Sequence, residues 1–356
     1  MAGKTMKAFV MKKIGEVGMI DKPVPEDPAP NDAIIKATTA LVCTSDVHTV
    51  KGAIGEKADL TLGHEGCGVV EKVGSAVTLF KPGDRIVVNA ITPCYKCHNC
   101  QRGFTSQCGE PLGGWKFANI KDGSFAEYFH VNDADANLTM IPDEVSDEAA
   151  CYTTDMMSTG FKGAENADIV LGGTAAVFGM GPVGQMAAVG ARLLGAGCVI
   201  AVDNIPHRLE LAKEYGADVL INYDEQDAVE EIVNLTNGEG VDSSLEAVGA
   251  QIPLENCIKV TRPGGTISNI GYHGEGEYLN IPRLEWGVGM AEKTIKTLLC
   301  PGGSERMTRL LRLIQTGRVD PTKMTSHHFS FDEIEKAFWM MDTKEDNMFK
   351  PVIHFE

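Results

Sequence analysis

The fold of this chain is decided by the stretch Gly179-Met180-Gly181-Pro182-Val183-Gly184, which has the spacing G-x-G-x-x-G. The stretch follows a strand-like apolar run at Ala175–Phe178 and opens a segment of helical length at Pro182–Leu194. This order of strand, glycine-rich turn and helix is the context in which the motif binds a dinucleotide. A glycine-rich turn without a ligand is the alternative that the motif alone leaves open.

Each glycine has a separate task in such a site. Gly179 permits the tight turn, Gly181 lets the backbone approach a pyrophosphate, and Gly184 lets helix and strand pack closely. Pro182 and Val183 then begin the helix, whose free N–H groups and dipole attract phosphate. We therefore expect these positions to bind the phosphates of a cofactor.

The type of dinucleotide is indicated by Asp203, which ends the next strand-like run 19 residues after Gly184. An acidic residue there accepts hydrogen bonds from the adenosine ribose of NAD and repels the 2′-phosphate of NADP. Arg208, five residues further on, is a candidate for stacking on adenine or covering a phosphate. A solvated strand-end carboxylate and a surface arginine are the alternatives. The sequence predicts NAD in preference to NADP.

Strand and helix patterns alternate from about residue 159 to residue 299. The expected strands after the first are Cys198–Asp203, Val219–Asn222, Val241–Ala247, Gly265–Ile270 and Thr294–Leu299, and the helices between them are Pro206–Tyr215, Glu225–Thr236 and Ile252–Thr261. Such alternation predicts an α/β fold, a doubly wound parallel sheet with helices on both faces, of the Rossmann type.

The chain before about residue 158 has a different pattern. Short strand-like runs are separated by Pro and Gly turns, and helical patterns are scarce; the runs are Lys7–Lys12, Ile34–Val42, Gly68–Val73, Arg85–Ala90 and Phe125–Val131. This spacing favours a barrel or folded sheet. After residue 300 we expect two helices, Ser304–Thr316 and Phe331–Met341, and a closing strand at Lys350–His354.

Composition and charge exclude several classes of protein. Hydrophobic residues make up 43% and charged residues 23% of the 356 residues, which is ordinary for a globular chain. The net charge of −17 argues against general attraction to nucleic acid or to an anionic membrane. The sequence has neither a secretory signal pattern nor an apolar run long enough for a membrane span, so we expect a cytoplasmic protein.

Four of the ten cysteines, Cys94, Cys97, Cys100 and Cys108, lie within fifteen residues. In a cytosolic chain such a cluster points to thiols or metal ligands before disulfides. Four thiolates suit a tetrahedral, structural Zn²⁺. An iron–sulfur cluster fits less well because the last gap has seven residues where ferredoxin motifs have three followed by Pro. Spare thiols are the third alternative.

A second candidate metal set is dispersed along the chain. Cys43, His64 and Asp155 are residue types that form an open zinc site with room for a substrate. By spacing alone each position is a weak signal, because a cysteine after a strand-like run is more often a packing residue, and the neighbouring Glu65 is also compatible with a simple turn.

The stretch Gly63-His64-Glu65-x2-Gly68-x5-Gly74-x2-Val77 resembles the zinc-site signature of the medium-chain zinc alcohol dehydrogenases. The cysteine loop and the later G-x-G-x-x-G stand in the order of that family. Segments along nearly the whole chain look like the tetrameric bacterial secondary-alcohol dehydrogenases in particular; they are Cys43–Val50, Trp115–Asp135, Thr154–Glu165 and Arg283–Arg306. The resemblance implies a GroES-like β-rich catalytic domain, residues 1–158 and 300–356, around a Rossmann domain, residues 159–299, with the active site in the cleft between them.

The resemblance also implies roles for individual residues. It implies two zinc ions per subunit: a catalytic one held by Cys43, His64 and Asp155, with Glu65 as an intermittent ligand, and a structural one in the cysteine loop. Ser45 and His48 would form a proton relay. The residues at pocket-lining positions are Ala90, Trp115, Met156, Met290 and Leu299, of which Met290 is at a position that reaches a neighbouring subunit.

Two features of the chain depart from the thermophilic NADP-dependent members of that group. Those members lack the cysteine loop, and they carry Gly-Ser-Arg where this chain has Asp203-Asn204-Ile205. The cofactor therefore cannot be carried over from them, and Asp203 argues for NAD.

The function expected from the sequence is zinc-dependent, reversible oxidation of a small secondary alcohol to a ketone by hydride transfer to NAD, in a homotetramer. A polyol, amino-alcohol or aldehyde dehydrogenase of the same superfamily is the alternative within enzymes. The apolar pocket positions favour small alkyl chains. A cofactor-binding protein with a vestigial zinc site is the alternative from another class, against which stand the intact Cys43, Ser45, His48, His64 and Asp155.

Overall fold

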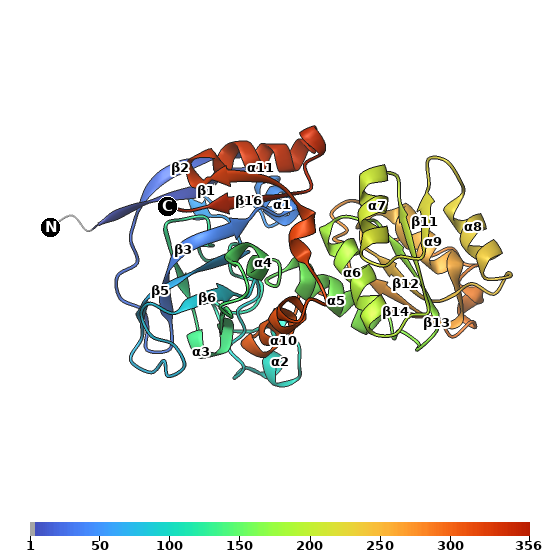
Figure 1. The fold of residues 1–356 in the computed structure, drawn as a ribbon, viewed down its shortest axis with the longest axis horizontal. Helices are drawn as coiled ribbons and strands as arrows, with labels where there is room; N and C mark the ends of the chain where they lie inside the picture. The colour runs from blue at the N-terminus through green and yellow to red at the C-terminus, as the bar shows by residue number, and fades with distance from the viewer. Residues whose placement is uncertain (1–3) are drawn as a thin grey trace. The chain divides into compact units, whose positions relative to one another are not determined.

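The computed structural model describes residues 4–356. The chain divides into two compact units, Met1–Ser158 with Cys300–Glu356, and Thr159–Leu299 (Figure 1). Within the described residues, no helix has the length and apolar character needed to cross a membrane.

A parallel sheet of six strands forms the centre of the unit Thr159–Leu299. Its strands are β9 (Thr174–Phe178), β10 (Cys198–Asp203), β11 (Val219–Asn222), β12 (Val241–Glu246), β13 (Thr261–Asn269) and β14 (Thr294–Thr297). They lie in the order β11-β10-β9-β12-β13-β14, which is the strand order of a doubly wound dinucleotide-binding sheet. The predicted Rossmann fold is confirmed.

Both faces of this sheet are covered because side chains on a strand alternate between its faces. Ala175 and Val177 of β9 pack with α6 (Pro182–Leu193) and α7 (Pro206–Glu214). Ala176 and Phe178 pack on the other face with α8 (Ala228–Leu235) and α9 (Gln251–Val260). Small alanines on the first face let α6 lie close to the strands.

One predicted helix begins later than expected. The segment Glu225–Thr236 was expected to be helical throughout, but α8 begins at Ala228. The reason is Asp227, whose carboxylate accepts hydrogen bonds from the backbone N–H groups of Val229 and Glu230 and caps the helix at that point.

Two sheets form the other unit. A three-stranded sheet has the order β2-β1-β4, and a seven-stranded sheet has the order β15-β16-β3-β5-β6-β8, with β7 pairing β3. The strands are β1 (Thr5–Lys13), β2 (Glu16–Pro23), β3 (Ala33–Leu41), β4 (Leu60–Thr61), β5 (Gly66–Val73), β6 (Arg85–Val88), β7 (Tyr128–Val131), β8 (Leu138–Met140), β15 (Thr325–Ser330) and β16 (Lys350–His354). The chain end returns to the first strands, since β16 pairs antiparallel with β3.

Helices are more frequent in this unit than the sequence patterns indicated. They are α1 (Thr44–Val50), α2 (His98–Gln101), α3 (Ala134–Asn137), α4 (Asp147–Cys151), α10 (Ser304–Gln315) and α11 (Ile334–Thr343), with short 3₁₀ turns at Thr105–Gln107, Pro321–Met324, Phe331–Glu333 and Glu345–Asn347; α5 (Met156–Asn166) leads into the second unit. Most are too short for a 3.6-residue period to emerge, so packing and caps determine them. The strands β2, β4, β8 and β15 were also missed.

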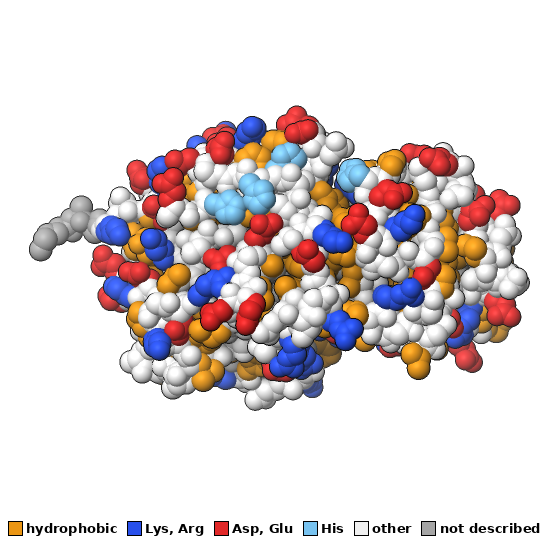
Figure 2. Space-filling model, viewed as in Figure 1, with side chains coloured by type: hydrophobic (Ala, Val, Ile, Leu, Met, Phe, Trp, Pro, Cys, Tyr) orange, Lys and Arg blue, Asp and Glu red, His pale blue; other side chains and the backbone are white. Residues whose placement is uncertain are grey.

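Charged side chains cover the surface in a mixed pattern. On the face shown in Figure 2, Lys and Arg are interspersed with Asp and Glu, and the described residues form no continuous basic surface on that face.

Candidate metal sites and cofactor pocket

Four of the predicted ligands come together in the unit Met1–Ser158 with Cys300–Glu356. Cys43 caps the N-terminus of α1, His64 and Glu65 lie between β4 and β5, and Asp155 lies between α4 and α5. Each residue offers one ligand atom, and these atoms all lie within 4.8 Å of one another. Residues separated by 112 positions in the sequence thus form one cluster.

The distances within this cluster suit a small tetrahedral metal ion. The Nε2 atom of His64 is 3.5 Å from Oδ2 of Asp155, and Sγ of Cys43 is 3.8 Å from the same oxygen. Ligands about 2.0–2.3 Å from a tetrahedral zinc are separated by about 3.3–3.8 Å. One sulfur, one nitrogen and one carboxylate oxygen therefore fit Zn²⁺.

Asp46 holds the segments that carry these ligands. Its carboxylate, 3% exposed, accepts hydrogen bonds from the backbone N–H groups of Cys43 (3.0 Å) and Gly63 (3.2 Å). Its Oδ1 is also 3.0 Å from Nδ1 of His64. Burial alone would lower the pKa of His64, but the carboxylates of Asp46 and Asp155 raise it well above its ordinary value. A carboxylate on the far ring nitrogen directs Nε2 toward a metal.

The carboxylate of Glu65 is engaged by a lysine. The Nζ atom of Lys350, on β16, lies 3.0 and 2.8 Å from the two carboxylate oxygens, and both side chains are fully buried. Burial raises the pKa of Glu65 to about 7, against the attraction of Lys350. The structure thus places Glu65 within reach of the other ligands and pairs it with a cation.

The two predicted relay residues, Ser45 and His48, are exposed and lie on α1, three positions apart and so on the same side of the helix. The Oγ of Ser45 is 3.6 Å from Sγ of Cys43. Partial burial, together with the nearby Lys51, lowers the pKa of His48 below its ordinary value. A neutral imidazole at this place can accept a proton.

The cysteine loop is a second compact cluster. The ligand sulfurs of Cys94, Cys97, Cys100 and Cys108 lie within 4.8 Å of one another, and those of Cys97 and Cys108 are 3.8 Å apart. A tetrahedral zinc with Zn–S bonds of about 2.3 Å separates its sulfurs by about 3.8 Å.

Backbone N–H groups favour the thiolate at Cys97, whereas burial raises the pKa of Cys94 and raises that of Cys100 to about 12. The N–H of Gly109 donates to Sγ of Cys97, and the N–H groups of Lys96 and Cys97 donate to Sγ of Cys94. The backbone N–H groups of Cys100 and Gly109 lower the pKa of Cys97 to about 6. Hydrogen bonds to sulfur favour the charged form that a metal requires.

The glycine-rich turn in the other unit has the geometry that phosphate binding needs. Gly179 has φ +93°, and a Cβ at Gly184 would lie 1.8 Å from the carbonyl oxygen of Gly179. A Cβ on Gly181 would meet nothing within 4 Å, so the space over this residue is open. Pro182 and Val183 form the first turn of α6. The backbone of this turn can therefore be approached closely by a ligand.

Asp203 lies at the carboxyl end of β10 beside this turn. Its carboxylate accepts hydrogen bonds from the backbone N–H groups of Met180 (2.7 Å), Asn204 (2.8 Å) and Ile205 (2.9 Å). The guanidinium of Arg208 lies 3.8 Å from Oδ2. Asp203 therefore shapes the turn as well as facing the cavity.

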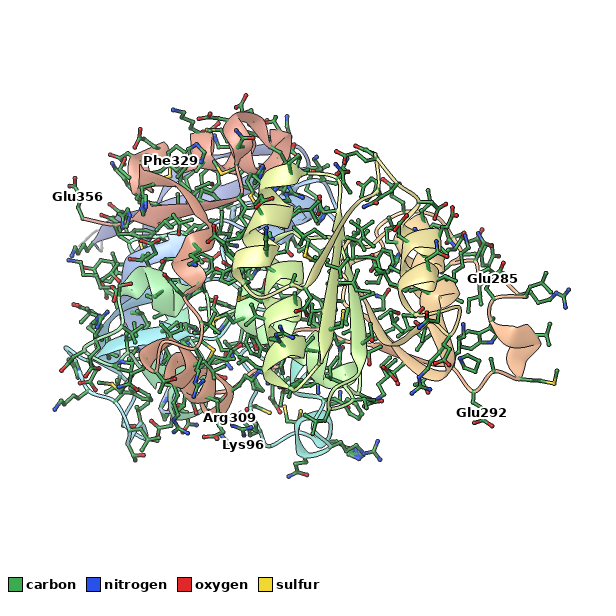
Figure 3. The ribbon with its side chains drawn as sticks, turned by 45° about the vertical axis from the view of Figure 1, so that its right-hand side comes forward. Lys96, Glu285, Glu292, Arg309, Phe329 and Glu356 are labelled. Carbon is green, nitrogen blue, oxygen red and sulfur yellow. The ribbon has the colours of Figure 1, made fainter. Side chains whose placement is uncertain are left out.

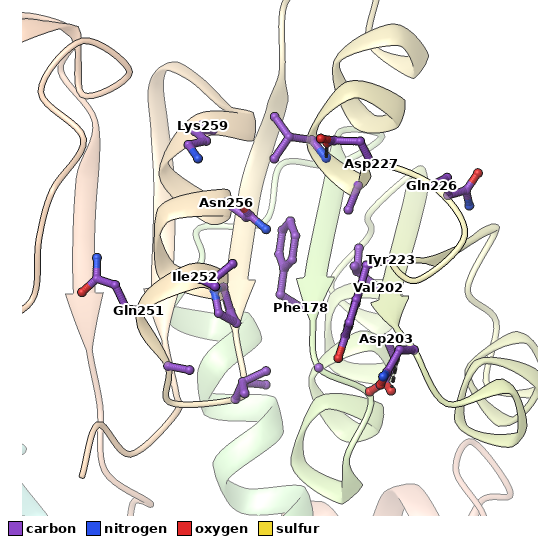
Figure 4. A pocket seen from close by; sticks show the side chains of 18 of the residues that line it. Phe178, Val202, Asp203, Tyr223, Gln226, Asp227, Gln251, Ile252, Asn256 and Lys259 are labelled. Carbon is purple, nitrogen blue, oxygen red and sulfur yellow. Dashed lines mark hydrogen bonds between the residues drawn. The ribbon is translucent and has the colours of Figure 1, made fainter. Parts of the chain in front are cut away.

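A cavity of about 1240 Å³ opens at these strand ends (Figure 4). Gly179, Gly181, Asp203 and Arg208 line it together with Tyr223 from the end of β11. Figure 4 shows Asp203 and Tyr223 on one side and Ile252 and Asn256 of α9 on the other. Tyr223 was not predicted; its position directly after a strand was the available signal.

The predicted pocket residues fall in both units. Ala90 and Met156 are buried near the dispersed cluster, because Ala90 N–H donates to the carbonyl of Thr154 and Met156 follows Asp155. Trp115 is half-buried. Met290 and Leu299 belong to the other unit and are exposed there. Neither unit by itself therefore brings all five predicted pocket residues together.

Comparison with known protein families matches residues 29–143 to the alcohol dehydrogenase GroES-like domain and residues 182–316 to the zinc-binding dehydrogenase domain. This chain belongs to the zinc-dependent alcohol dehydrogenases of the medium-chain superfamily. It is an enzyme that binds zinc and a nicotinamide cofactor. The predictions of family and enzyme class are confirmed.

Individual relatives extend over the whole chain. The NADP-dependent isopropanol dehydrogenase of Thermoanaerobacter brockii is 53% identical, with 98% of this chain and 99% of the relative covered. The sorbitol dehydrogenase of Bacillus subtilis is 33% identical, with 94% and 93% covered. Among solved structures, the zinc-dependent alcohol dehydrogenase 2 from Streptococcus pneumonia has a TM-score of 0.91 at 32% identity, with 99% of both chains covered.

We predict two metal sites with separable roles. Cys43→Ala should abolish turnover and leave the unfolding temperature nearly unchanged. Cys97→Ala should mainly lower stability, because a structural zinc contributes folding energy. Metal analysis and thermal unfolding of both variants check this: about two zinc ions per wild-type chain are expected, and about one would contradict the two-site account.

Proposed function

We propose that this enzyme oxidises small secondary alcohols to ketones, reversibly, with NAD preferred to NADP. The observation that carries the proposal is the cluster of Cys43, His64 and Asp155 beside the buried, apolar Ala90 and Met156. An apolar surface next to a metal favours a substrate with one hydroxyl between small alkyl groups. The isopropanol dehydrogenase activity named for the relative from T. brockii supports the same substrate class.

In the proposed site, Cys43, His64 and Asp155 hold the catalytic zinc, and Glu65 is a fourth ligand available when Lys350 releases it. When bound, Zn²⁺ supplies Lewis acidity at the substrate oxygen, and the nicotinamide supplies the hydride acceptor. Cys94, Cys97, Cys100 and Cys108 hold the structural zinc. With four protein ligands that site is closed to substrate.

The residues of α1 move the hydroxyl proton. Ser45 Oγ lies next to the ligand Cys43, so it is placed to accept the proton of a substrate hydroxyl bound at the same metal. His48, whose pKa is lowered, is neutral at neutral pH and accepts the proton at the helix surface. A bound cofactor would supply ribose hydroxyls that can pass the proton on from Ser45 to His48.

Asp203 is the proposed reason for the preference for NAD. Its carboxylate faces the cavity, and a 2′-phosphate there would place like charges in contact. The T. brockii relative is named as an NADP-dependent enzyme, so this chain should differ from that relative in cofactor. Arg208 opposes the preference, since a guanidinium can hold a phosphate, but in this structure it lies beside Asp203.

We further propose that the enzyme is a homotetramer. Strand β14 is the last of its sheet, so one edge can pair with another chain. Nearby apolar side chains are exposed, among them Tyr278 (75%), Leu284 (69%) and Met290 (78%). Figure 3 shows that the segment between Glu285 and Glu292 projects from the body of its unit. Exposed apolar groups of this extent favour contact with a second copy; sedimentation equilibrium measures the number of chains.

The sorbitol dehydrogenase relative favours a second candidate, oxidation of polyols. Steady-state rates on isopropanol, 1-propanol and sorbitol, each with NAD and NADP, separate the candidates. We expect the highest kcat/KM for isopropanol and a preference for NAD of roughly tenfold, which needs only about 1.4 kcal/mol. Asp203→Asn keeps a hydrogen-bond acceptor and removes the charge, so it should relieve NADP; Asp203→Gly should also weaken NAD.

The proposal fails in its substrate part if sorbitol is the best substrate. It fails in its cofactor part if the wild-type enzyme uses NADP as well as NAD, or if Asp203→Asn leaves the ratio of the two kcat/KM values unchanged.

The relay predicts a pH effect of His48→Ala. Because the pKa of His48 is lowered, the wild-type imidazole stays neutral, and able to accept a proton, at a lower pH than an ordinary histidine does. Without it, solvent hydroxide must take the proton, so turnover should fall most at low pH and recover toward high pH. The measurement is kcat from pH 5.5 to 9.5. An unchanged profile would remove His48 from the mechanism.

A further inference from the structure

We propose that Lys116 and Asn119 are positioning residues for the substrate pocket. They connect the cysteine loop to Trp115 and to α1. The position of Trp115 therefore depends on whether the loop holds its metal ion. The inference rests on the proposed function and on the pocket-lining position that the family resemblance implies for Trp115. It assigns the cysteine loop a role in substrate binding in addition to stability.

The residues before Trp115 pack directly on a cysteine of the loop. A Cβ added to Gly113 would lie 2.5 Å from Sγ of Cys108, and one added to Gly114 would lie 2.5 Å from the carbonyl oxygen of Ser106. The backbone N–H of Trp115 donates to that same carbonyl (3.1 Å). The backbone from Gly113 to Trp115 thus lies directly against the loop, so we expect a shift of Cys108 to displace it.

Lys116 fastens the two segments together. Its ammonium donates to the carbonyl oxygens of Cys108 (2.7 Å), Glu110 (2.7 Å) and Gly113 (3.2 Å). Three carbonyls use all the donors of one ammonium group. The charge also lies close to a loop in which four thiolates exceed the charge of one Zn²⁺. Lys116 therefore stabilises the arrangement of the loop that suits a metal ion. It also fixes the loop to the backbone next to Trp115.

Asn119 continues the connection to the helix of the proposed relay. Its Nδ2 donates to the carbonyl of Trp115 (2.8 Å), and its Oδ1 accepts from the hydroxyl of Thr49 (3.2 Å). Thr49 is buried on α1, the helix that carries Ser45. The backbone of Trp115 is thus held on both sides, by the cysteine loop through Lys116 and by α1 through Asn119.

The first test compares Lys116→Met with Lys96→Met. Both substitutions remove one positive charge from the same region. The side chain of Lys96, which Figure 3 labels, is 71% exposed, and it pairs with Asp133. We expect Lys116→Met to raise the KM for isopropanol about tenfold, the size of one lost charge-assisted hydrogen bond, with kcat changed less than about twofold. Lys96→Met should leave the KM for isopropanol unchanged. Neither substitution should change the KM for NAD.

A double-mutant cycle shows whether Lys116 acts through Trp115. In a Trp115→Ala background, Lys116→Met should have little further effect on the KM for isopropanol, because the group it positions is gone. An equal rise in both backgrounds would overturn the proposal, and so would an unchanged KM in Lys116→Met alone. Asn119→Ala removes the hydrogen bonds to Thr49 and to the carbonyls of Trp115 and Phe117 but leaves Lys116 in place. It serves if Lys116→Met does not fold, and it should also raise the KM for isopropanol.

A measurement without turnover tests the loop itself. With a chromogenic chelator in excess, Lys116→Met should release one zinc equivalent about tenfold faster than the wild type and than Lys96→Met. An unchanged release rate would overturn the proposal. If the wild-type enzyme does not oxidise secondary alcohols, the proposed function fails, while this measurement still decides whether Lys116 holds the loop.

Discussion

The buried carboxylate of Asp46 is the contact on which the candidate catalytic site depends. It binds the backbone at Cys43 and at Gly63 and the ring of His64, so one side chain joins the start of α1 to the loop before β5. A buried charge is stable only when it is hydrogen-bonded and paired, and these three groups satisfy it. Cys43 and His64 lie on separate segments of the chain. The distance between these two ligands therefore depends on the carboxylate that joins the segments.

Much of the fold and the site could be predicted because it depends on local sequence. The glycine-rich turn and the alternating strands and helices identify the parallel sheet, and Asp203 is the last residue of one of its strands. The cysteine loop lies within fifteen residues, so its spacing alone suggested zinc. The dispersed cluster needed the family resemblance, because spacing does not show that Asp155 lies next to Cys43.

The groups around the ligands could not be predicted with the same ease. Asp46 has a local signal, since a carboxylate three residues after an N-cap forms a capping box. Lys350 has none: it is 285 residues from Glu65, and only the return of β16 to β3 brings it there. The short helix α1 was missed for a related reason, because caps and tertiary contacts determine it and a hydrophobic period does not.

We predict that Asp46 organises the candidate catalytic metal site, and the zinc affinity of an Asp46→Asn variant measures this. Asp32→Asn is a matched control, because Asp32 is a buried carboxylate paired with His130 in the same unit. Chelator competition should show one of two zinc ions bound about 10–100-fold more weakly in Asp46→Asn, with the other unchanged. Asp32→Asn should bind both as the wild type does. Equal affinity for both ions in Asp46→Asn and the wild type would contradict the account.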